Sequence, residues 1–342
     1  MNTVSTCAAC GSREWSHVEN WRGFEIVQCH ECGLQFTLNP QYEPEQYEDA
    51  YEGSGNIPVP EEHSYVYTSP AERLRLEADA LFVAPPRLTP AERLALRWLR
   101  NNAPRNALVV DCGCGTGRFL RALNRHGFQS VGIDISAEIV DLLSKAGLTA
   151  VQGKAPDFPW NGEDPFAITF FEVLEHIPMP VEMLNTLRER FPKTAIIASV
   201  PSPYRPGLLF KGKRGLSDYP PNHFLRWTPK ALEIAFQKAG YREVKVILPK
   251  PVGSEMLPGL GQIVFKLRER LRSGRKGEQG ATPQQRKQRS NEITLTHRIK
   301  TTAALWILYL YQRTADVVGF PKAWLASRRG ASAASMLVIA EP

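Results

Sequence analysis

Three alternate glycines separate a short apolar run from an amphipathic segment. The stretch reads VVDCGCGTGRFL over residues 109–120, and its glycines are Gly113, Gly115 and Gly117. Glycine permits a positive φ and lacks the Cβ atom that would keep a ligand away from the main chain. The amides that open the following helix offer unpaired donors and the positive end of the helix dipole. The stretch therefore predicts a strand, a loop that binds a nucleotide-like ligand, and a helix.

The glycine spacing argues against two common nucleotide sites. A dinucleotide fingerprint requires G-x-G-x-x-G, but the sixth position counted from Gly113 is Arg118. A P-loop requires Gly-Lys-Ser/Thr at the end of the loop, and this triplet does not follow. NAD binding and NTP hydrolysis are therefore disfavoured.

A second acidic residue lies at the spacing of one βαβ unit. Asp134 ends the strand-like segment SVGID, 23 positions after Asp111. A carboxylate at the tip of the second strand can accept hydrogen bonds from both hydroxyls of a ribose. The alternative is that the glycines serve only the packing of a tight turn and that Asp134 is a solvated strand end.

Together these residues resemble the class I S-adenosylmethionine-dependent methyltransferases, in which an acid precedes G-x-G-x-G and the second strand ends in the ribose-binding acid. The resemblance continues in FAITFFEVLEHIPMP at 166–180 and in PNHF at 221–224, and it extends from 91 to 249. It implies an α/β fold with a Rossmann-like seven-stranded sheet that closes with an antiparallel strand. The cofactor contacts that it implies are Asp111, Gly113, Cys114, Gly115, Gly117, Asp134, Ile135 and Glu172.

Two C-x-x-C pairs near the amino terminus have the spacing of a metal site. Cys7 and Cys10 form the first pair, Cys29 and Cys32 form the second, and 18 residues lie between the pairs. Four thiolates can surround Zn²⁺ tetrahedrally, and the glycine after each pair lets backbone amides approach the sulfurs. Because protein fills all four positions, we expect a structural zinc ribbon.

The net charge of +7 is unevenly distributed along the 342 residues. Residues 250–330 contain 16 Lys and Arg against 5 Asp and Glu.

The amino terminus lacks the basic and apolar regions of a signal peptide, and the sequence has no apolar run of the length that spans a bilayer. We therefore expect a cytoplasmic protein, in which cysteines favour metal over disulfides.

Alternating strand and helix patterns predict a parallel sheet. The expected helices are 90–101, 117–126, 136–146, 180–191 and 228–239, and the expected strands are 107–111, 129–133, 148–151, 166–171, 194–200, 241–248 and 334–340. The predicted organisation is a zinc ribbon at 1–38, a Tyr- and Pro-rich connector at 39–90, a methyltransferase core at 91–249 plus 334–342, and a basic helical insertion at 250–333. Tyr65 and Tyr67 in the connector are candidates for the acceptor pocket.

The basic insertion contains a predicted helix at 292–318. Its apolar run of nine residues, AALWILYLY, is too short to span a bilayer, which needs about 20. A helix with basic flanks and aromatic residues suits a membrane interface, so 262–318 is a candidate for peripheral membrane contact. The alternative is a helix packed on the sheet. We recognise no RNA-binding module, so a nucleic-acid partner is disfavoured.

Histidines that follow the strands are the candidate catalytic groups. Ligands bind at the carboxyl ends of the strands in this kind of sheet, and His176 and His223 both follow predicted strands, which favours a general base. Glu172, Glu175 and His176 also resemble the metal-binding segment of the polyprenyl-quinone O-methyltransferases. If helical, they share one face and could hold Mg²⁺. The alternative is that they only organise the pocket by hydrogen bonds.

The resemblance implies methyl transfer from S-adenosylmethionine to a small-molecule, sugar or lipid-linked acceptor. With its ribbon, the chain is similar to bacterial zinc-ribbon methyltransferases associated with surface saccharide or natural-product assembly. One alternative is a Mg²⁺-dependent quinone-type O-methyltransferase. Another is a membrane-peripheral adaptor whose cofactor-binding fold is not catalytic. Lys154 departs from the family pattern, because relatives often carry an acid near the adenine there.

Overall fold

The main sheet has seven strands in the order β10-β11-β8-β7-β4-β5-β6. The computed structural model describes residues 5–40, 88–155, 162–212, 214–256 and 314–342. The strands are β4 (Leu108–Cys112), β5 (Gln129–Asp134), β6 (Ala150–Gln152), β7 (Ala167–Phe171), β8 (Ala195–Pro201), β10 (Glu243–Ile247) and β11 (Ser335–Glu341). β11 pairs antiparallel with both β8 and β10, whereas β4 to β8 pair in parallel. This confirms the predicted seven-stranded sheet.

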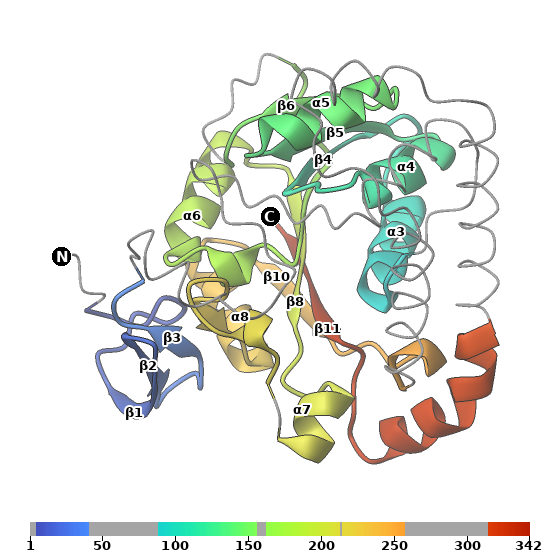
Figure 1. Cartoon of the computed structure of the whole chain (residues 1–342). Helices are drawn as coiled ribbons and strands as arrows, with labels where there is room; N and C mark the ends of the chain where they lie inside the picture. Colours follow the sequence, from blue (N-terminus) through green and yellow to red (C-terminus); the bar gives the residue numbers. More distant parts are fainter. Residues whose placement is uncertain (1–4, 41–87, 156–161, 213, 257–313) are drawn as a thin grey trace, which may run out of the picture.

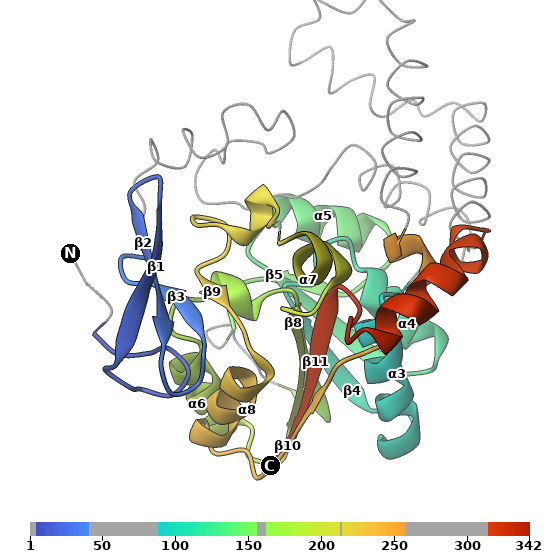
Figure 2. The ribbon, with the colours of Figure 1, turned by 90° about the horizontal axis from the view of Figure 1, so that it is seen from below.

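Helices cover both faces of the sheet (Figure 1). They are α3 (Pro90–Asn102), α4 (Arg118–Arg125), α5 (Ala137–Lys145), α6 (Pro180–Arg190), α7 (Pro206–Lys211) and α8 (Pro229–Lys238), with short 3-10 turns at Leu174–His176, Leu216–Asp218 and Gly253–Met256. Figures 1 and 2 show α3 and α4 on one face and α6 and α8 on the other. Each face has its own buried apolar cluster. The layering leaves the loops at the carboxyl ends of the strands available for a site.

Local capping explains where several helices begin. The Thr89, Ser136 and Thr228 side chains each accept a hydrogen bond from the first turn of α3, α5 and α8. Glu92 completes a capping box with Thr89 and also accepts two hydrogen bonds from the Arg118 guanidinium, at 2.9 and 2.7 Å. The glycine-loop helix α4 is therefore tied to α3 at its first residue.

The ribbon forms its own small sheet but takes its fourth strand from the core. Its strands are β1 (Trp15–Trp21), β2 (Phe24–Cys29), β3 (Gln35–Thr37) and β9 (Leu225–Arg226), in that order. β3 pairs antiparallel with β9, which begins two residues after His223. Thr228 Oγ1 also donates to the Cys32 carbonyl at 2.7 Å. The sequence did not predict this pairing, because two residues are too short a strand to leave a pattern.

The basic insertion is described only at its two ends. Residues 314–328 are helical, so the helix continues past the predicted end at 318. Gly319 lies inside this helix and packs on the backbone of Gly253, where an added Cβ would meet the Gly253 carbonyl at 2.1 Å. The connector residues 41–87, including Tyr65 and Tyr67, and residues 257–313 lie outside the described part. Within that part, no helix has the length and apolarity needed to cross a membrane.

Candidate active site

The three positions of the loop that are occupied by glycine differ in their surroundings. All have positive φ, of 71°, 48° and 67° at Gly113, Gly115 and Gly117. A Cβ on Gly113 would meet Val173 at 2.5 Å, and one on Gly117 would meet Leu143 at 2.5 Å, so both positions are closed by packing. An added Cβ on Gly115 would meet no atom within 4 Å. Gly115 is therefore the loop position whose backbone stands open to a ligand.

Asp134 is held at the tip of β5 by the glycine loop. Its Oδ2 accepts a hydrogen bond from the Gly115 amide at 3.0 Å, and its Oδ1 accepts one from the Ser136 amide at 3.0 Å. Burial raises the pKa of the carboxyl, while these amide hydrogen bonds lower it. The two backbone donors fix the carboxylate beside Gly115, where the loop leaves open space for a ligand.

Asp111 is buried at the end of β4 and does not face solvent. Its Oδ1 accepts a hydrogen bond from Thr169 Oγ1 at 2.6 Å, across the β4–β7 pair. Burial raises the pKa of Asp111 to about 7. Its geometry suits a residue that braces the loop from beneath.

We expect Asp111→Asn to flatten the pH dependence of stability. The pKa of Asp111 rises from 3.8 to about 7 on folding, so between these values the folded state keeps a proton that the unfolded chain releases, and stability falls as pH rises. This loss in the free energy of unfolding reaches at most about 4 kcal/mol. Between about pH 5 and about pH 8, the melting temperature of the ligand-free wild type should fall several degrees further than that of Asp111→Asn. Parallel curves for the two proteins would contradict this assignment.

The two loop cysteines are packing residues rather than nucleophiles. Cys112 and Cys114 are buried, and burial raises the pKa of both thiols well above the usual range. The Cys114 sulfur lies against Gly132, where an added Cβ would approach it to 2.6 Å. Gly132 is thus a residue that the loop requires and that the sequence did not single out.

Glu172 follows β7 and turns away from the predicted metal set. It has a positive φ of 59°, and its Oε1 accepts a hydrogen bond from Ser199 Oγ at 2.8 Å. The 3-10 turn begins only at Leu174, so Glu172 does not share a helical face with Glu175 and His176. The prediction that these three residues form one helical face was wrong, because the backbone reverses at Glu172.

Two histidines from distant loops meet beside a buried glutamate. The rings of His176 and His223 lie edge to face, with centroids 4.8 Å apart. Glu175 is 0% exposed, and neither of its carboxylate oxygens has a hydrogen-bond partner in the described part of the chain. Its Oε1 lies 3.9 Å from His223 Nε2. Ligand atoms of these three side chains lie within 4.8 Å of one another.

The surroundings keep both imidazoles neutral. His176 Nδ1 lies 2.6 Å from the Asn222 carbonyl, so this nitrogen carries the proton and Nε2 carries the lone pair of the neutral ring. Burial lowers the pKa of His176. Burial, His176 and nearby arginines lower the pKa of His223 to about 2. Asn222 is a positioning residue that sequence reasoning missed, because its contribution comes from its backbone.

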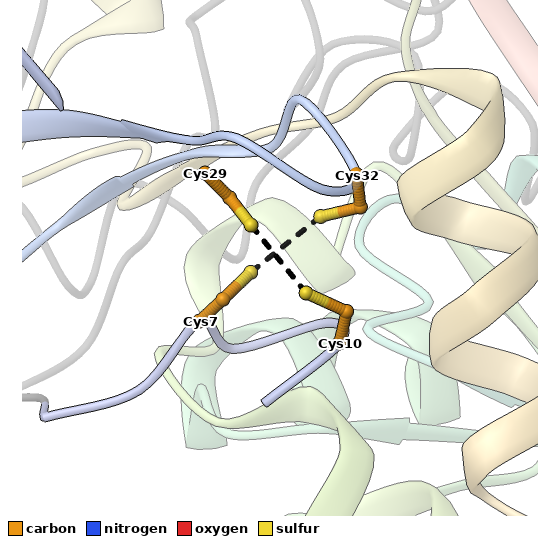
Figure 3. Close-up of side chains that lie close together, drawn as sticks. All are labelled: Cys7, Cys10, Cys29 and Cys32. Carbon is orange, nitrogen blue, oxygen red and sulfur yellow. Dashed lines mark hydrogen bonds between the residues drawn. The ribbon is translucent and has the colours of Figure 1, made fainter. Parts of the chain in front are cut away.

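The four predicted zinc ligands form one cluster (Figure 3). Cys7 Sγ lies 3.5 Å from Cys32 Sγ, and Cys10 Sγ lies 3.4 Å from Cys29 Sγ. All four residues are buried and none forms a disulfide. Zn–S bonds of about 2.3 Å place tetrahedral sulfurs about 3.8 Å apart, so the cluster is compatible with a tetrahedral metal ion.

Of the remaining predicted contacts, Ile135 lies next to Asp134, and its carbonyl accepts a hydrogen bond from Gln152 Nε2 at 3.1 Å. Lys154 is exposed. The loop glycines, Asp111, Asp134 and Ile135 all lie at the carboxyl ends of β4 and β5. The histidine pair follows β7 and β8, the next two strands of the sheet.

The chain is similar in sequence to known methyltransferases. Residues 87–246 match the family model described as a methyltransferase domain. The ubiquinone biosynthesis O-methyltransferase of Xanthomonas axonopodis pv. citri is 30% identical over 156 residues, 43% of this chain and 54% of the relative. The EEF1A lysine methyltransferase 2 of Mus musculus is 39% identical over 69 residues, 18% of this chain and 28% of the relative.

The chain thus spans about half of the length of the first of these curated relatives and less of the second. A solved SAM-dependent methyltransferase from Archaeoglobus fulgidus is 17% identical, with a TM-score of 0.42, over 73% of this chain and 94% of that one. The family match spans the glycine loop, Asp134 and both candidate histidines, and the sheet has the seven strands and the antiparallel closing strand that the sequence predicted. This chain therefore contains a class I S-adenosylmethionine-dependent methyltransferase domain, with residues 87–246 at its centre and β11 closing its sheet.

Proposed function

We propose that this protein is an enzyme that transfers a methyl group from S-adenosylmethionine to a small-molecule acceptor. The observation that carries the proposal is the hydrogen bond from the Gly115 amide to Asp134, which lies beside the open space at the Gly115 Cα. Each Asp134 oxygen accepts one backbone hydrogen bond and retains a lone pair, so the carboxylate can accept from both ribose hydroxyls. The cofactor supplies an electrophilic methyl carbon, and the protein must align it with the acceptor and exclude water.

We assign His176 the role of general base for an acceptor that must lose a proton, with His223 as the second candidate. Because His176 Nδ1 donates to the Asn222 carbonyl, Nε2 carries the lone pair of the neutral ring and is the nitrogen that would take a proton. His176→Gln is expected to lower kcat by about 100-fold or more and to leave cofactor binding within a factor of about two. His126→Gln, which alters an exposed histidine, is the control. An unchanged kcat in His176→Gln would remove this role.

Methyl transfer itself is the test of the proposed function. The zinc-loaded protein is incubated with methyl-labelled S-adenosylmethionine and fractionated cell extract, and label is sought in the small-molecule, sugar and lipid fractions. Calorimetry with S-adenosylmethionine is run on the same protein. Binding without transfer into any fraction would favour the non-catalytic adaptor, and an absence of binding would refute the proposal.

The finer identity of the acceptor is an inference from the surrounding modules. A sugar or lipid-linked acceptor remains our proposal from the resemblance to zinc-ribbon methyltransferases. Exposed apolar side chains on the helix at 314–328, among them Val317, Phe320 and Trp324, support a peripheral membrane contact. Most of the segment 262–318 lies outside the described residues. Flotation with anionic vesicles, with and without residues 262–328, tests this contact.

We further infer that the ribbon holds a structural zinc ion. The cysteine cluster offers four soft ligands and leaves no position for substrate. A unit as small as residues 5–38 has too little apolar core to fold without such a staple.

Metal-assisted methylation is the second candidate function, favoured by the unpartnered Glu175 carboxylate beside His176 and His223. A buried carboxylate without hydrogen bonds is costly unless it is protonated or meets a cation. The ligand set differs from the predicted one, because His223 replaces Glu172. The test adds Mg²⁺ to metal-depleted buffer while the ribbon zinc stays bound. Higher methyl transfer in wild type but not in Glu175→Gln would support the metal, and equal rates with and without Mg²⁺ would exclude it.

A further inference from the structure

A cavity of about 190 Å³ lies between the ribbon and the carboxyl end of β8. Gln28, Gly33 and Gln35 line it from the ribbon, and Arg205, Arg214 and His223 are among the residues that line it from the core. Because His223 also contacts His176, this cavity adjoins the two-histidine site. We call it the ribbon cavity.

Arg226 lines the ribbon cavity with an unsatisfied donor. Its Nε donates to the Asp218 carbonyl at 3.0 Å, and its Nη1 donates to Glu19 Oε1 at 2.7 Å. Its Nη2 has no hydrogen-bond partner in the described residues, although the side chain is only 9% exposed. A buried charged donor left unpaired costs the desolvation of that group. An acceptor from a ligand would remove this cost.

Two further guanidinium groups line the same cavity. Arg205 pairs with the Asp218 carboxylate, whereas Arg214 donates to the neutral Gln35 side chain at 3.3 Å, the one hydrogen bond that it forms within the described residues. No carboxylate of the described residues lies within ion-pair distance of Arg214. Burial and the neighbouring Arg226 lower the pKa of Arg214, and the more distant Asp218 carboxylate offsets this only in part. Among the described residues, the three guanidinium groups thus form ion pairs with two carboxylates, those of Asp218 and Glu19.

We propose that the ribbon cavity binds an oxyanion carried by the methyl acceptor, a phosphate or a carboxylate group, through Arg205, Arg214 and Arg226. Guanidinium groups match the planar, multiple acceptors of both anions. Naming the acceptor as the ligand rests on the proposed function, but anion binding can be tested without it. An acceptor held in this way is anchored by its charged end next to the two histidines.

The test uses the zinc-loaded full chain and calorimetric titration with inorganic phosphate, pyrophosphate and malonate. Arg226 also joins β9 to the ribbon, so replacing it risks the fold. Arg214→Gln therefore carries the test, because Arg214 makes a single long hydrogen bond. Arg214→Lys restores the charge, and Arg97→Gln removes the same charge from an exposed site elsewhere on the surface. Melting curves confirm that each variant is folded.

We expect Arg214→Gln to weaken anion binding about tenfold or more, Arg214→Lys to weaken it less, and Arg97→Gln to stay within a factor of about two. Tighter binding of phosphate or pyrophosphate indicates a phosphorylated acceptor, and tighter binding of malonate indicates a carboxylate. The inference is overturned if no probe binds the wild type or if Arg214→Gln binds as the wild type does. S-adenosylmethionine is titrated in parallel: its failure to bind would refute the proposed function and leave the anion result standing.

Discussion

Asp134→Ala is expected to weaken S-adenosylmethionine binding by about 100-fold or more. The substitution removes the acceptor for two ribose hydroxyls, and charge-assisted hydrogen bonds contribute about 1.5–3 kcal/mol each. It also leaves the Gly115 and Ser136 amides without the acceptor that they have now. Calorimetric titration of the cofactor measures the effect directly.

The matched control for this prediction is Asp141→Ala. Asp141 is an exposed carboxylate on the neighbouring α5, where it pairs with Lys145. Its removal should leave cofactor affinity unchanged, because a surface ion pair contributes little. Burial raises the pKa of Asp134, which means that the buried carboxylate does not itself stabilise the fold. Asp134→Ala should therefore remain folded, and melting curves check this. Cofactor affinity in Asp134→Ala within threefold of wild type would be inconsistent with the assigned ribose contact.

Cys29→Ser is expected to unfold the ribbon and to release β9 from it. Structural zinc contributes about 10–16 kcal/mol of apparent binding energy in small zinc domains, far more than a unit of this size gains from its apolar core. Because β3 pairs with β9 and Thr228 donates to the Cys32 carbonyl, the loop that carries His223 should lose protection with the ribbon. Hydrogen exchange is the measurement, with protection lost in β2, β3 and β9 and retained in α4 and β4.

Metal content and a cysteine control complete this experiment. The wild type should carry one equivalent of zinc and Cys29→Ser much less. Cys114→Ala removes a buried thiol outside the cluster and should keep the full equivalent. If Cys29→Ser retained zinc and protection in β9, the ribbon would not depend on the metal and would not support the His223 loop.

Much of the core could be predicted because its signals are local. The apolar strands, the helix caps and the glycine loop each lie within a few consecutive residues, and the observed β4, β5 and α4 begin and end within one or two residues of their predicted bounds. The closing strand was predicted across the longest separation in the sequence. More than eighty residues lie between β10 and β11, yet the two strands pair as predicted. A strand buried on both faces has an apolar pattern that an insertion does not alter.

The candidate site depends on contacts that leave no local pattern. The spacing E-x-x-E-H suggested one helical face, but the positive φ at Glu172 turns that side chain toward Ser199 instead. His223 then occupies the place beside Glu175, although 47 positions separate it from His176 in the sequence. Backbone conformation at one residue decided which groups meet, and residue types alone do not encode it.

By itself the sequence determined the glycine loop, the carboxylate at the end of the second strand and the four-cysteine cluster, because spacing within a short segment defines each of them. The tertiary structure alone decided how these parts are joined. It pairs β9 with the ribbon, brings His176 and His223 together, and gathers three arginines around one cavity. The physical reason is that these contacts arise from the packing of segments far apart in the chain, where burial and the need to satisfy polar groups select the partners.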